Sequence, residues 1–228
     1  MHGKIVVFEG IDGSGKGTQS KKLYQHLKEL NYKVILLEFP FYSETFFGKE
    51  VGNYLNGDFG GLNDVHPKLS AMLYAGDRFE KKELILQKLK DGYIIICDRY
   101  VPSNIAHQTA KYKDEDKQEE LKKWIKKMEY DIYGLPKPDV VFFMNMNPNI
   151  SDDLVLKKDT RNYTDKKKDL HESNNSYLID VYNMFQKMSK SKLWVNIKCQ
   201  DKENNLKNVE DIQKNILKKL KNKGLIND

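Results

Sequence analysis

Short apolar runs rich in β-branched residues recur along this chain, and segments with helical spacing of their apolar positions separate them. Runs of this kind are typical of buried strands. Several are apolar on nearly every residue, which indicates a sheet covered on both faces and therefore parallel. The predicted strands begin with Ile5-Val6-Val7-Phe8 and continue with residues 33–39, 93–98, 139–144 and 193–197.

Apolar residues three and four positions apart predict helices in the intervening segments. The predicted helices cover residues 15–31, 48–55, 66–90, 103–113, 115–133, 178–188 and 209–220. Strands that alternate with helices predict a doubly wound α/β fold of five parallel strands, with helices on both faces and ligands at the carboxyl ends of the strands. Since we find no internal repeat or linker, residues 1–228 are predicted to form one domain.

Residues 151–170 depart from this pattern. They are rich in lysine and aspartate and show no apolar periodicity. Such a segment predicts a mobile basic excursion over the surface rather than part of the core. We refer to residues 151–170 as the predicted lid.

The first strand runs directly into a glycine-rich stretch, Gly10-Ile11-Asp12-Gly13-Ser14-Gly15-Lys16-Gly17-Thr18. The spacing G-x-x-x-x-G-K between a strand and a helix predicts a loop whose backbone N–H groups cradle a polyphosphate. The helix that follows adds its positive N-terminal end, and Lys16 adds a mobile charge. The alternative is an ordinary glycine turn, which the strand before and the helix after make less favourable.

The position after the lysine differs from the usual phosphate loop. A Ser or Thr hydroxyl normally contacts Mg²⁺ there, but this chain has Gly17, followed by Thr18. Asp98 ends an apolar strand, so its carboxylate is expected at the same edge of the sheet. We therefore predict Mg²⁺ held through Thr18, through water, or by the phosphates and Asp98. For Asp98, a cap on the following helix is the structural alternative.

Composition narrows the class of protein. With 39% hydrophobic residues, 228 residues can bury one substantial core. No apolar run approaches the length of a membrane span and no basic-then-apolar leader precedes the first strand, so no membrane partner is expected. Cys97 and Cys199 lack metal-ligand spacing, which predicts reduced thiols in a cytoplasmic protein.

The net charge of +6 comes largely from lysines interspersed with acidic residues, which indicates a solvated surface. Nucleic-acid binding would require a concentrated basic face with exposed aromatic side chains, and we see none in the sequence. No nucleic-acid partner is therefore predicted. Attraction of anionic nucleotides fits the positive excess equally well.

Further motifs occur in the order and spacing of one family. They are Phe8-Glu9-Gly10-Ile11-Asp12-Gly13-Ser14-Gly15-Lys16, Phe39-Pro40, Leu73-Tyr74-Ala75-Gly76-Asp77-Arg78-Phe79-Glu80, Asp98-Arg99-Tyr100 and Gly134-Leu135-Pro136-Lys137-Pro138-Asp139. Over nearly its whole length the chain resembles thymidylate kinases. It looks closest to a bacterial-type branch in which a run like Lys168-Asp169-Leu170-His171-Glu172 follows the lid. The resemblance implies a P-loop fold, a homodimer packed through the helices after residues 66 and 100, and transfer of the γ-phosphoryl of ATP to dTMP.

Two pairs at i, i+4 spacing are candidates for recognising a base. Asn104 and Gln108 share one helix face, and their amides offer both donors and acceptors, as a pyrimidine edge requires. Tyr74 and Arg78 form the second pair. The alternatives are a surface helix that carries two amides by chance and, for Tyr74, an aromatic side chain buried in the core. The resemblance implies that Asn104 or Gln108 contacts the thymine edge, that Tyr74 stacks on thymine and that Arg78 reaches its carbonyl oxygen.

Arg99 carries a planar fork suited to gripping two phosphates at once. The resemblance implies that Arg99 lies between the donor and acceptor phosphates. It also implies that Asp12, which could otherwise be a simple turn residue, contacts the acceptor sugar hydroxyl. His107 matches the aromatic position that crowds the sugar 2′ carbon and favours deoxyribose; a histidine there departs from the family.

Two cations of related enzymes are replaced here. Many relatives have an arginine where this chain has Gly13, and many eukaryotic relatives have one where it has Tyr42. Lys157, Lys158 and Arg161 of the predicted lid are the available substitutes, and we favour Arg161. Tyr42 can donate one hydrogen bond but brings no charge, so acceptor-phosphate binding should depend more on Arg99.

The resulting site has three parts. The predicted ATP-binding residues are Gly10, Asp12, Gly13, Ser14, Gly15, Lys16, Gly17 and Thr18. The predicted acceptor-binding residues are Asp12, Phe39, Tyr42, Tyr74, Arg78, Arg99, Asn104, His107 and Gln108. The predicted catalytic residues are Lys16, Asp98, Arg99 and Arg161, with Thr18 and Asp98 as the metal ligands.

Other functions remain open at this point. A kinase for another nucleotide or a deoxynucleoside is the nearest alternative, because Gly-Lys-Gly-Thr resembles adenylate kinases at this one place. A non-catalytic nucleotide- or nucleic-acid-binding module on the same fold is the alternative of a different class. Gly17 and Tyr42, which remove two expected contacts, motivate that alternative.

Overall fold

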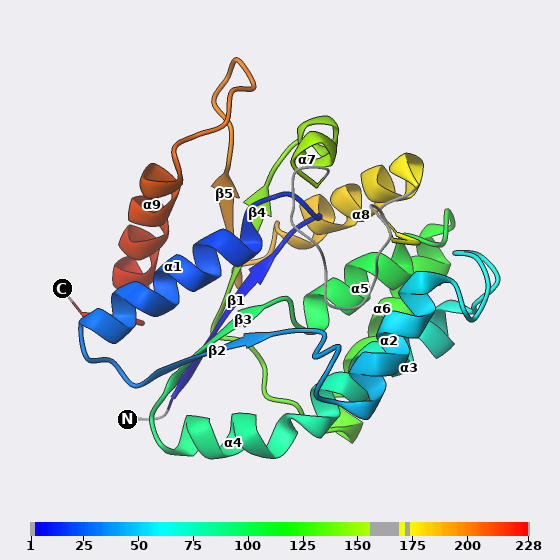
Figure 1. Ribbon diagram of the computed structural model, residues 1–228, viewed down its shortest axis with the longest axis horizontal. Coiled ribbons are helices and arrows are strands. Elements are labelled where there is room, and N and C mark those ends of the chain that lie inside the picture. Colours follow the sequence, from blue (N-terminus) through cyan, green and yellow to red (C-terminus); the bar gives the residue numbers. More distant parts are fainter. Residues whose placement is uncertain (1–2, 156–168, 172–173, 228) are drawn as a thin grey trace.

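The computed structural model describes residues 3–155, 169–171 and 174–227. Five parallel strands form one sheet in the order β2-β3-β1-β4-β5 (Figure 1). The strands are β1 (Lys4–Glu9), β2 (Val34–Glu38), β3 (Ile94–Asp98), β4 (Val140–Asn145) and β5 (Trp194–Lys198). The predicted five-stranded parallel sheet is confirmed.

Helices cover both faces of the sheet. They are α1 (Lys16–Glu29), α2 (Phe46–Asn56), α3 (Pro67–Glu80), α4 (Lys82–Lys90), α5 (Val101–Thr109), α6 (Glu115–Lys126), the π-helix η1 (Lys127–Ile132), α7 (Pro148–Val155), α8 (Asn175–Met188) and α9 (Val209–Asn222). Among them, α1 and α9 lie on one face, whereas α3, α4, α5 and α6 lie on the other (Figure 1).

Alternation along the strands divides the core into two layers. On β1, Val6 and Phe8 pack with Leu23 of α1 and Ile216 of α9. The intervening residues Ile5 and Val7 pack with α3, α4, α5 and α6. Both faces of the central strand are therefore buried, as the nearly continuous apolar runs predict.

The predicted helix 66–90 is wrong in one respect, because the chain forms two helices that meet at Lys81. Glu80, the last residue of α3, accepts hydrogen bonds from the backbone N–H groups of Phe46 and Phe47, at 3.0 and 2.8 Å, in the first turn of α2. Beyond the break, Ile85 of α4 packs on the sheet. The apolar spacing continues through Lys81 and does not reveal the break. The helix is interrupted there because α3 and α4 pack against different neighbours.

The first part of the predicted lid is also different, since residues 151–155 belong to α7. The side chain of Asn147 accepts a hydrogen bond from the N–H of Asn149 at 3.0 Å, and Pro148 occupies the first helical position. A capping side chain followed by proline is a signal for the start of a helix. The prediction from the high charge content of this segment overlooked it. Residues 156–168, with Lys157, Lys158 and Arg161, lie outside the described residues.

None of the helices within the described ranges is both long enough and apolar enough to cross a bilayer.

Candidate active site

The glycine-rich loop joins β1 to α1 at the carboxyl edge of the sheet. Gly10 and Gly13 have φ values of 144° and 78°, a region that residues with a Cβ rarely adopt. A Cβ on Gly13 would also lie 2.3 Å from the carbonyl oxygen of Ser151 in α7. The loop arginine of many relatives could therefore not be accommodated here without moving α7.

Gly15 is the N-cap of α1 and has no side chain with which to cap that helix. The positive end of the helix lies at the loop, where it favours an anion. Lys16, the next residue, is buried, and its Nζ donates to the carbonyl oxygen of Ile11 at 2.8 Å. The same Nζ lies 3.8 Å from Oδ1 of Asp12.

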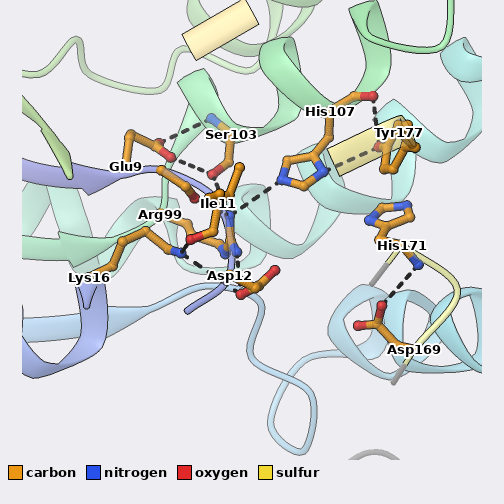
Figure 2. A network of polar contacts seen from close by, with 11 residues as sticks. Glu9, Ile11, Asp12, Lys16, Arg99, Ser103, His107, Asp169, His171 and Tyr177 are labelled. Atoms are coloured by element: carbon orange, nitrogen blue, oxygen red, sulfur yellow. Dashed lines mark hydrogen bonds and ion pairs between the residues drawn. The ribbon is translucent and has the colours of Figure 1, made fainter. Parts of the chain in front are cut away.

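Arg99 contacts the same carboxylate oxygen of Asp12 as Lys16 does, as Figure 2 shows. Its Nη2 donates to Oδ1 of Asp12 at 2.7 Å, and its Nη1 donates to Oγ of Ser103 at 3.2 Å. Burial alone would lower the pKa of Arg99, but the carboxylates of Asp12 and Asp98 outweigh it and raise the pKa, so the guanidinium stays charged. The backbone of Arg99 has a φ of 66°, a strained conformation for a residue with a side chain.

The carboxylate of Asp98 lies close to Gly17, the residue after Lys16. A Cβ on Gly17 would lie 3.0 Å from Oδ2 of Asp98, so this face of α1 is open to that carboxylate. Oδ1 of Asp98 is buried, and the described residues give it no hydrogen-bond partner. Burial raises the pKa of Asp98, which Lys16 and Arg99 partly offset.

This geometry fits a hard cation, because an unsatisfied buried carboxylate oxygen beside a phosphate loop can hold Mg²⁺ directly or through water. Thr18, the other predicted ligand, is exposed on α1. Asp98 is therefore the better supported of the two. No cluster of three His, Cys, Asp or Glu side chains suited to a metal occurs among the described residues.

Glu9 is a residue of this site that the sequence did not assign. It is fully buried, and its carboxylate accepts the N–H groups of Tyr100 and Ser103, at 2.9 and 3.1 Å, as well as the hydroxyl of Ser103 (Figure 2). These amides belong to the start of α5, so Glu9 caps that helix from the neighbouring strand. Burial raises the pKa of Glu9 to about 7, although the bonds to Ser103 and the charge of Arg99 lower it.

Next to the loop lies a cleft of about 550 Å³, its open mouth included. It contains all nine predicted acceptor-binding residues, which come from the loop, the segment between β2 and α2, α3, the β3–α5 turn and α5. Pro40, Leu55, Ser103, Asp169 and His171 also line it, and the sequence did not predict these five as site residues. The structure thus brings together the acceptor set that the resemblance implied.

A stack of two histidines forms one wall of the cleft. The rings of His107 and His171 have centroids 5.2 Å apart and an interplanar angle of 17°. Arg99 Nη1 lies 3.5 Å from Nε2 of His107, and the hydroxyl of Tyr177 lies 3.2 Å from Nδ1. Because a guanidinium only donates, Nε2 accepts and Nδ1 carries the proton. Burial and the neighbouring His171 and Arg99 hold the pKa of His107 well below its usual range, so the ring is neutral.

The far end of the cleft is a buried polar network. Arg78 donates to Glu129 through Nε at 2.6 Å and through Nη2 at 2.7 Å. Nδ2 of Asn104 donates to Oε1 of Glu129 at 2.8 Å. Oε1 of Gln108 accepts from the hydroxyl of Ser70 at 2.7 Å. Oδ1 of Asn104 and Nε2 of Gln108 are buried, and neither has a partner among the described side chains and backbone.

Glu129 was missed as well, although the sequence holds one signal of it. In the predicted helix 115–133, Leu121, Ile125, Met128 and Glu129 share the buried face, and a charged side chain there requires a partner. Its position in sequence does not reveal that Arg78 is that partner.

A phosphate loop at the carboxyl edge of a parallel sheet, beside a cleft lined by amides, aromatic rings and arginines, is the arrangement of a P-loop phosphotransferase. The cleft is the candidate site for its acceptor. The family model described as thymidylate kinase matches residues 8–216 of this chain. The chain belongs to the thymidylate kinase family, whose members are nucleoside monophosphate kinases.

Individual relatives agree. Thymidylate kinase of Plasmodium falciparum is 30% identical over 96% of this chain and 90% of its own length. Human thymidylate kinase is 35% identical over 63% of this chain and 61% of its own length. In fold, the chain is similar to the solved structure of thymidylate kinase from Candida albicans, with a TM-score of 0.75 and 23% identity over 100% of this chain and 96% of the other.

Proposed function

We propose that this protein transfers the γ-phosphoryl of ATP to dTMP, with the phosphate loop as donor site and the cleft as acceptor site. The observation that carries the proposal is the position of Arg99. Its guanidinium lines the acceptor cleft and is bonded to Asp12 of the phosphate loop. A bidentate cation at that point can contact the anions of both substrates.

Catalysis on this proposal rests on alignment and charge neutralisation rather than on a general base. The attacking oxygen belongs to a phosphate monoester that is mostly dianionic at neutral pH, because its second pKa is about 6. Lys16 and Arg99 must neutralise the charge of two phosphate groups held end to end. Binding must first separate both cations from Asp12, which contacts them in the structure.

Asp98 would hold Mg²⁺, directly or through water, and Thr18 is the second proposed ligand. When bound, the ion would neutralise charge on the donor phosphates. From the sequence alone, Arg161 is proposed to add a further cation. On this proposal the part of the predicted lid that follows α7 excludes water from ATP.

The base of dTMP is proposed to occupy the far end of the cleft, where Tyr74 offers a ring for stacking. Unpaired Oδ1 of Asn104 and Nε2 of Gln108 supply one acceptor and one donor. Thymine presents an N–H between two carbonyl oxygens, so this pair of groups matches its edge. His107 and Asp12 would contact the sugar, while Phe39 and Tyr42 would flank the acceptor phosphate.

We further propose a homodimer that acts in the cytoplasm, each subunit being one catalytic domain. Leu69, Met72 and Phe79 of α3 are exposed apolar side chains, and burying them against a second copy would remove them from water. Both free cysteines are buried, which suits a reducing compartment. Light scattering of the purified protein measures the oligomeric state.

The test is an ADP-release assay across nucleoside monophosphates and deoxynucleosides, with magnesium varied. We expect dTMP to give the highest kcat/KM and activity to disappear when magnesium is chelated. Faster turnover of another acceptor would show that the cleft is the binding site for that acceptor rather than for dTMP. Nucleotide binding with no ADP release would make the protein a non-catalytic binding module.

A further inference from the structure

Glu129 is a buried carboxylate that the transfer reaction itself does not use. It lies on η1, and its side chain is 0% exposed. Single π-helical turns are rare and change which residues face a neighbouring element. Glu129 faces α3 and α5, where it contacts Arg78 and Asn104.

The orientation of the Asn104 amide follows from these contacts. Nδ2 of Asn104 lies 2.8 Å from Oε1 of Glu129 and 3.0 Å from the carbonyl oxygen of Ala71. Both are acceptors, so only the NH₂ end of the amide can face them. A flipped amide would set its oxygen against two other oxygens and lose both of these hydrogen bonds in a buried place. Oδ1 is therefore the end left over for a ligand of the cleft, which Asn104 lines.

Arg78 is held by the same carboxylate. Two of its donors, Nε and Nη2, are used by Glu129 at 2.6 and 2.7 Å, and the side chain is almost fully buried. Burial disfavours the charge of Arg78, but Glu129 outweighs it and raises the pKa. The donors that remain on the guanidinium belong to Nη1 and the second hydrogen of Nη2, and Arg78 also lines the cleft.

We propose that Glu129 is a positioning residue that sets the hydrogen-bond polarity of the base pocket, so that it accepts a pyrimidine with an imide N–H and rejects one with a ring acceptor and an amino group. By fixing Asn104 as an acceptor and Arg78 as a donor, one carboxylate selects thymine or uracil over cytosine. This inference rests on the proposed function, because it takes the cleft as the acceptor site.

The decisive variant is Glu129→Gln, which keeps the size of the side chain but replaces one acceptor oxygen with a donor. If that donor takes the place of Oε1, the Asn104 amide must flip and present NH₂ to the base, and the bond from Nη2 of Arg78 is lost as well. If it takes the place of Oε2, the bond from Nε of Arg78 is lost. We expect roughly a tenfold or greater fall in the ratio of kcat/KM for dTMP to kcat/KM for dCMP. The change should appear mainly in the KM for the acceptor, with kcat and the KM for ATP nearly unchanged.

Two further variants separate positioning from packing. Glu119→Gln makes the same chemical change on the exposed face of α6, where Glu119 pairs with Lys122 at 2.8 Å, and should leave every constant unchanged. Glu129→Asp keeps both acceptor oxygens and withdraws them by one methylene. It should raise the KM for dTMP severalfold while the preference for dTMP over dCMP stays near that of the wild type.

Thermal melting first establishes which variants fold, because removing the partner of a buried Arg78 is destabilising. If Glu129→Gln is folded and its base preference is that of the wild type, the proposal is overturned. If it does not fold, Glu129→Asp decides: an unchanged KM for dTMP overturns the proposal, and a raised one with normal kcat supports it. Wild-type protein that neither binds nor phosphorylates dTMP overturns the proposed function itself, and this inference with it.

Discussion

The two ends of the candidate site are built differently. At the phosphate end, the loop offers backbone amides and two cations, Lys16 and Arg99, that share Asp12 as a counter-ion. At the base end, Arg78 is 2% exposed and is held by Glu129, which is 0% exposed. The phosphate end thus has charges that a ligand can take over, whereas the base end has polar groups already locked by protein partners.

On the proposed function, this difference follows from what each end recognises. Phosphates are charged alike whatever nucleotide carries them, so backbone amides and exchangeable cations suffice. A base differs from its competitors by the direction of a few hydrogen bonds, so the groups that contact it must not rotate. We therefore expect changes at the phosphate end to lower kcat and changes at the base end to raise the KM for the acceptor.

The largest effect is expected at Arg99. Arg99→Ala removes the cation placed between the two phosphates and should lower kcat by roughly 10²–10³-fold. The melting temperature should stay close to that of the wild type, because the substitution retains the Cβ at this strained backbone position. Steady-state ADP release measures the rate, with Arg99→Lys as the variant that keeps charge but loses the fork. Near-normal turnover of Arg99→Ala would remove Arg99 from its proposed role.

A smaller effect, on stability, is expected at Glu9. Its pKa is raised from 4.5 to about 7 by burial, so the folded protein keeps a proton that the unfolded chain releases. This group favours the folded state most below pH 4.5, and that contribution is lost as the pH rises from 4.5 to 7. Relative to wild type, Glu9→Gln should therefore gain stability between pH 4.5 and 8 by on the order of 2–3 kcal/mol.

Urea unfolding of the wild type and of Glu9→Gln, at pH 4.5 and at pH 8, measures this difference in stability. Glu210→Gln, at an exposed position paired with Lys22, should show no such gain. A gain for Glu9→Gln that does not depend on pH would contradict the assignment of the buried proton to Glu9.

At the base end, Tyr74→Leu should act on binding. Stacking of a base on an aromatic ring contributes about 1–3 kcal/mol, so the KM for dTMP should rise by roughly tenfold or more. We expect kcat and the KM for ATP to change little, in contrast to Arg99→Ala. Initial-rate measurements with each substrate varied test this separation. A fall in kcat with an unchanged KM for dTMP would contradict the expectation that the base end acts on acceptor binding and the phosphate end on turnover.

The smallest effect is expected for Ser70→Ala. The Ser70 hydroxyl donates to Oε1 of Gln108 and accepts from Nζ of Lys111 at 3.1 Å. Without it, the Gln108 amide can rotate, and a neutral hydrogen bond of this kind is worth about 1 kcal/mol. The KM for dTMP should rise a few-fold at unchanged kcat. Ser189→Ala, which alters a half-buried hydroxyl at the C-cap of α8, provides the control.

Local sequence was enough for much of this structure. The alternation of apolar runs and helical spacing predicts the parallel sheet, and the glycines with Lys16 predict the phosphate loop, because neither depends on distant residues. The resemblance to thymidylate kinases then named nine acceptor-site residues, and all nine line one cleft. Their individual roles stay predictions.

Other features depend on contacts between segments far apart in the chain. The break at Lys81 follows from Glu80 bonding to the start of α2. The role of Glu9 as a cap on α5 involves an acid on a strand and amides more than 90 residues later. The start of α7 was a local signal, Asn147 followed by Pro148, that the high charge of the segment concealed.

The amino-acid sequence by itself determined the five strands, most of the helices between them, the phosphate loop and the family, because all of these depend on the spacing of residues along the chain. Tertiary structure alone decided which polar atoms are already paired and which face the cleft. Glu129 is an example. The sequence shows a carboxylate on a buried helix face, but only folding brings Arg78 and Asn104 into contact with it. A hydrogen bond has a direction in space, and spacing in sequence does not carry that direction.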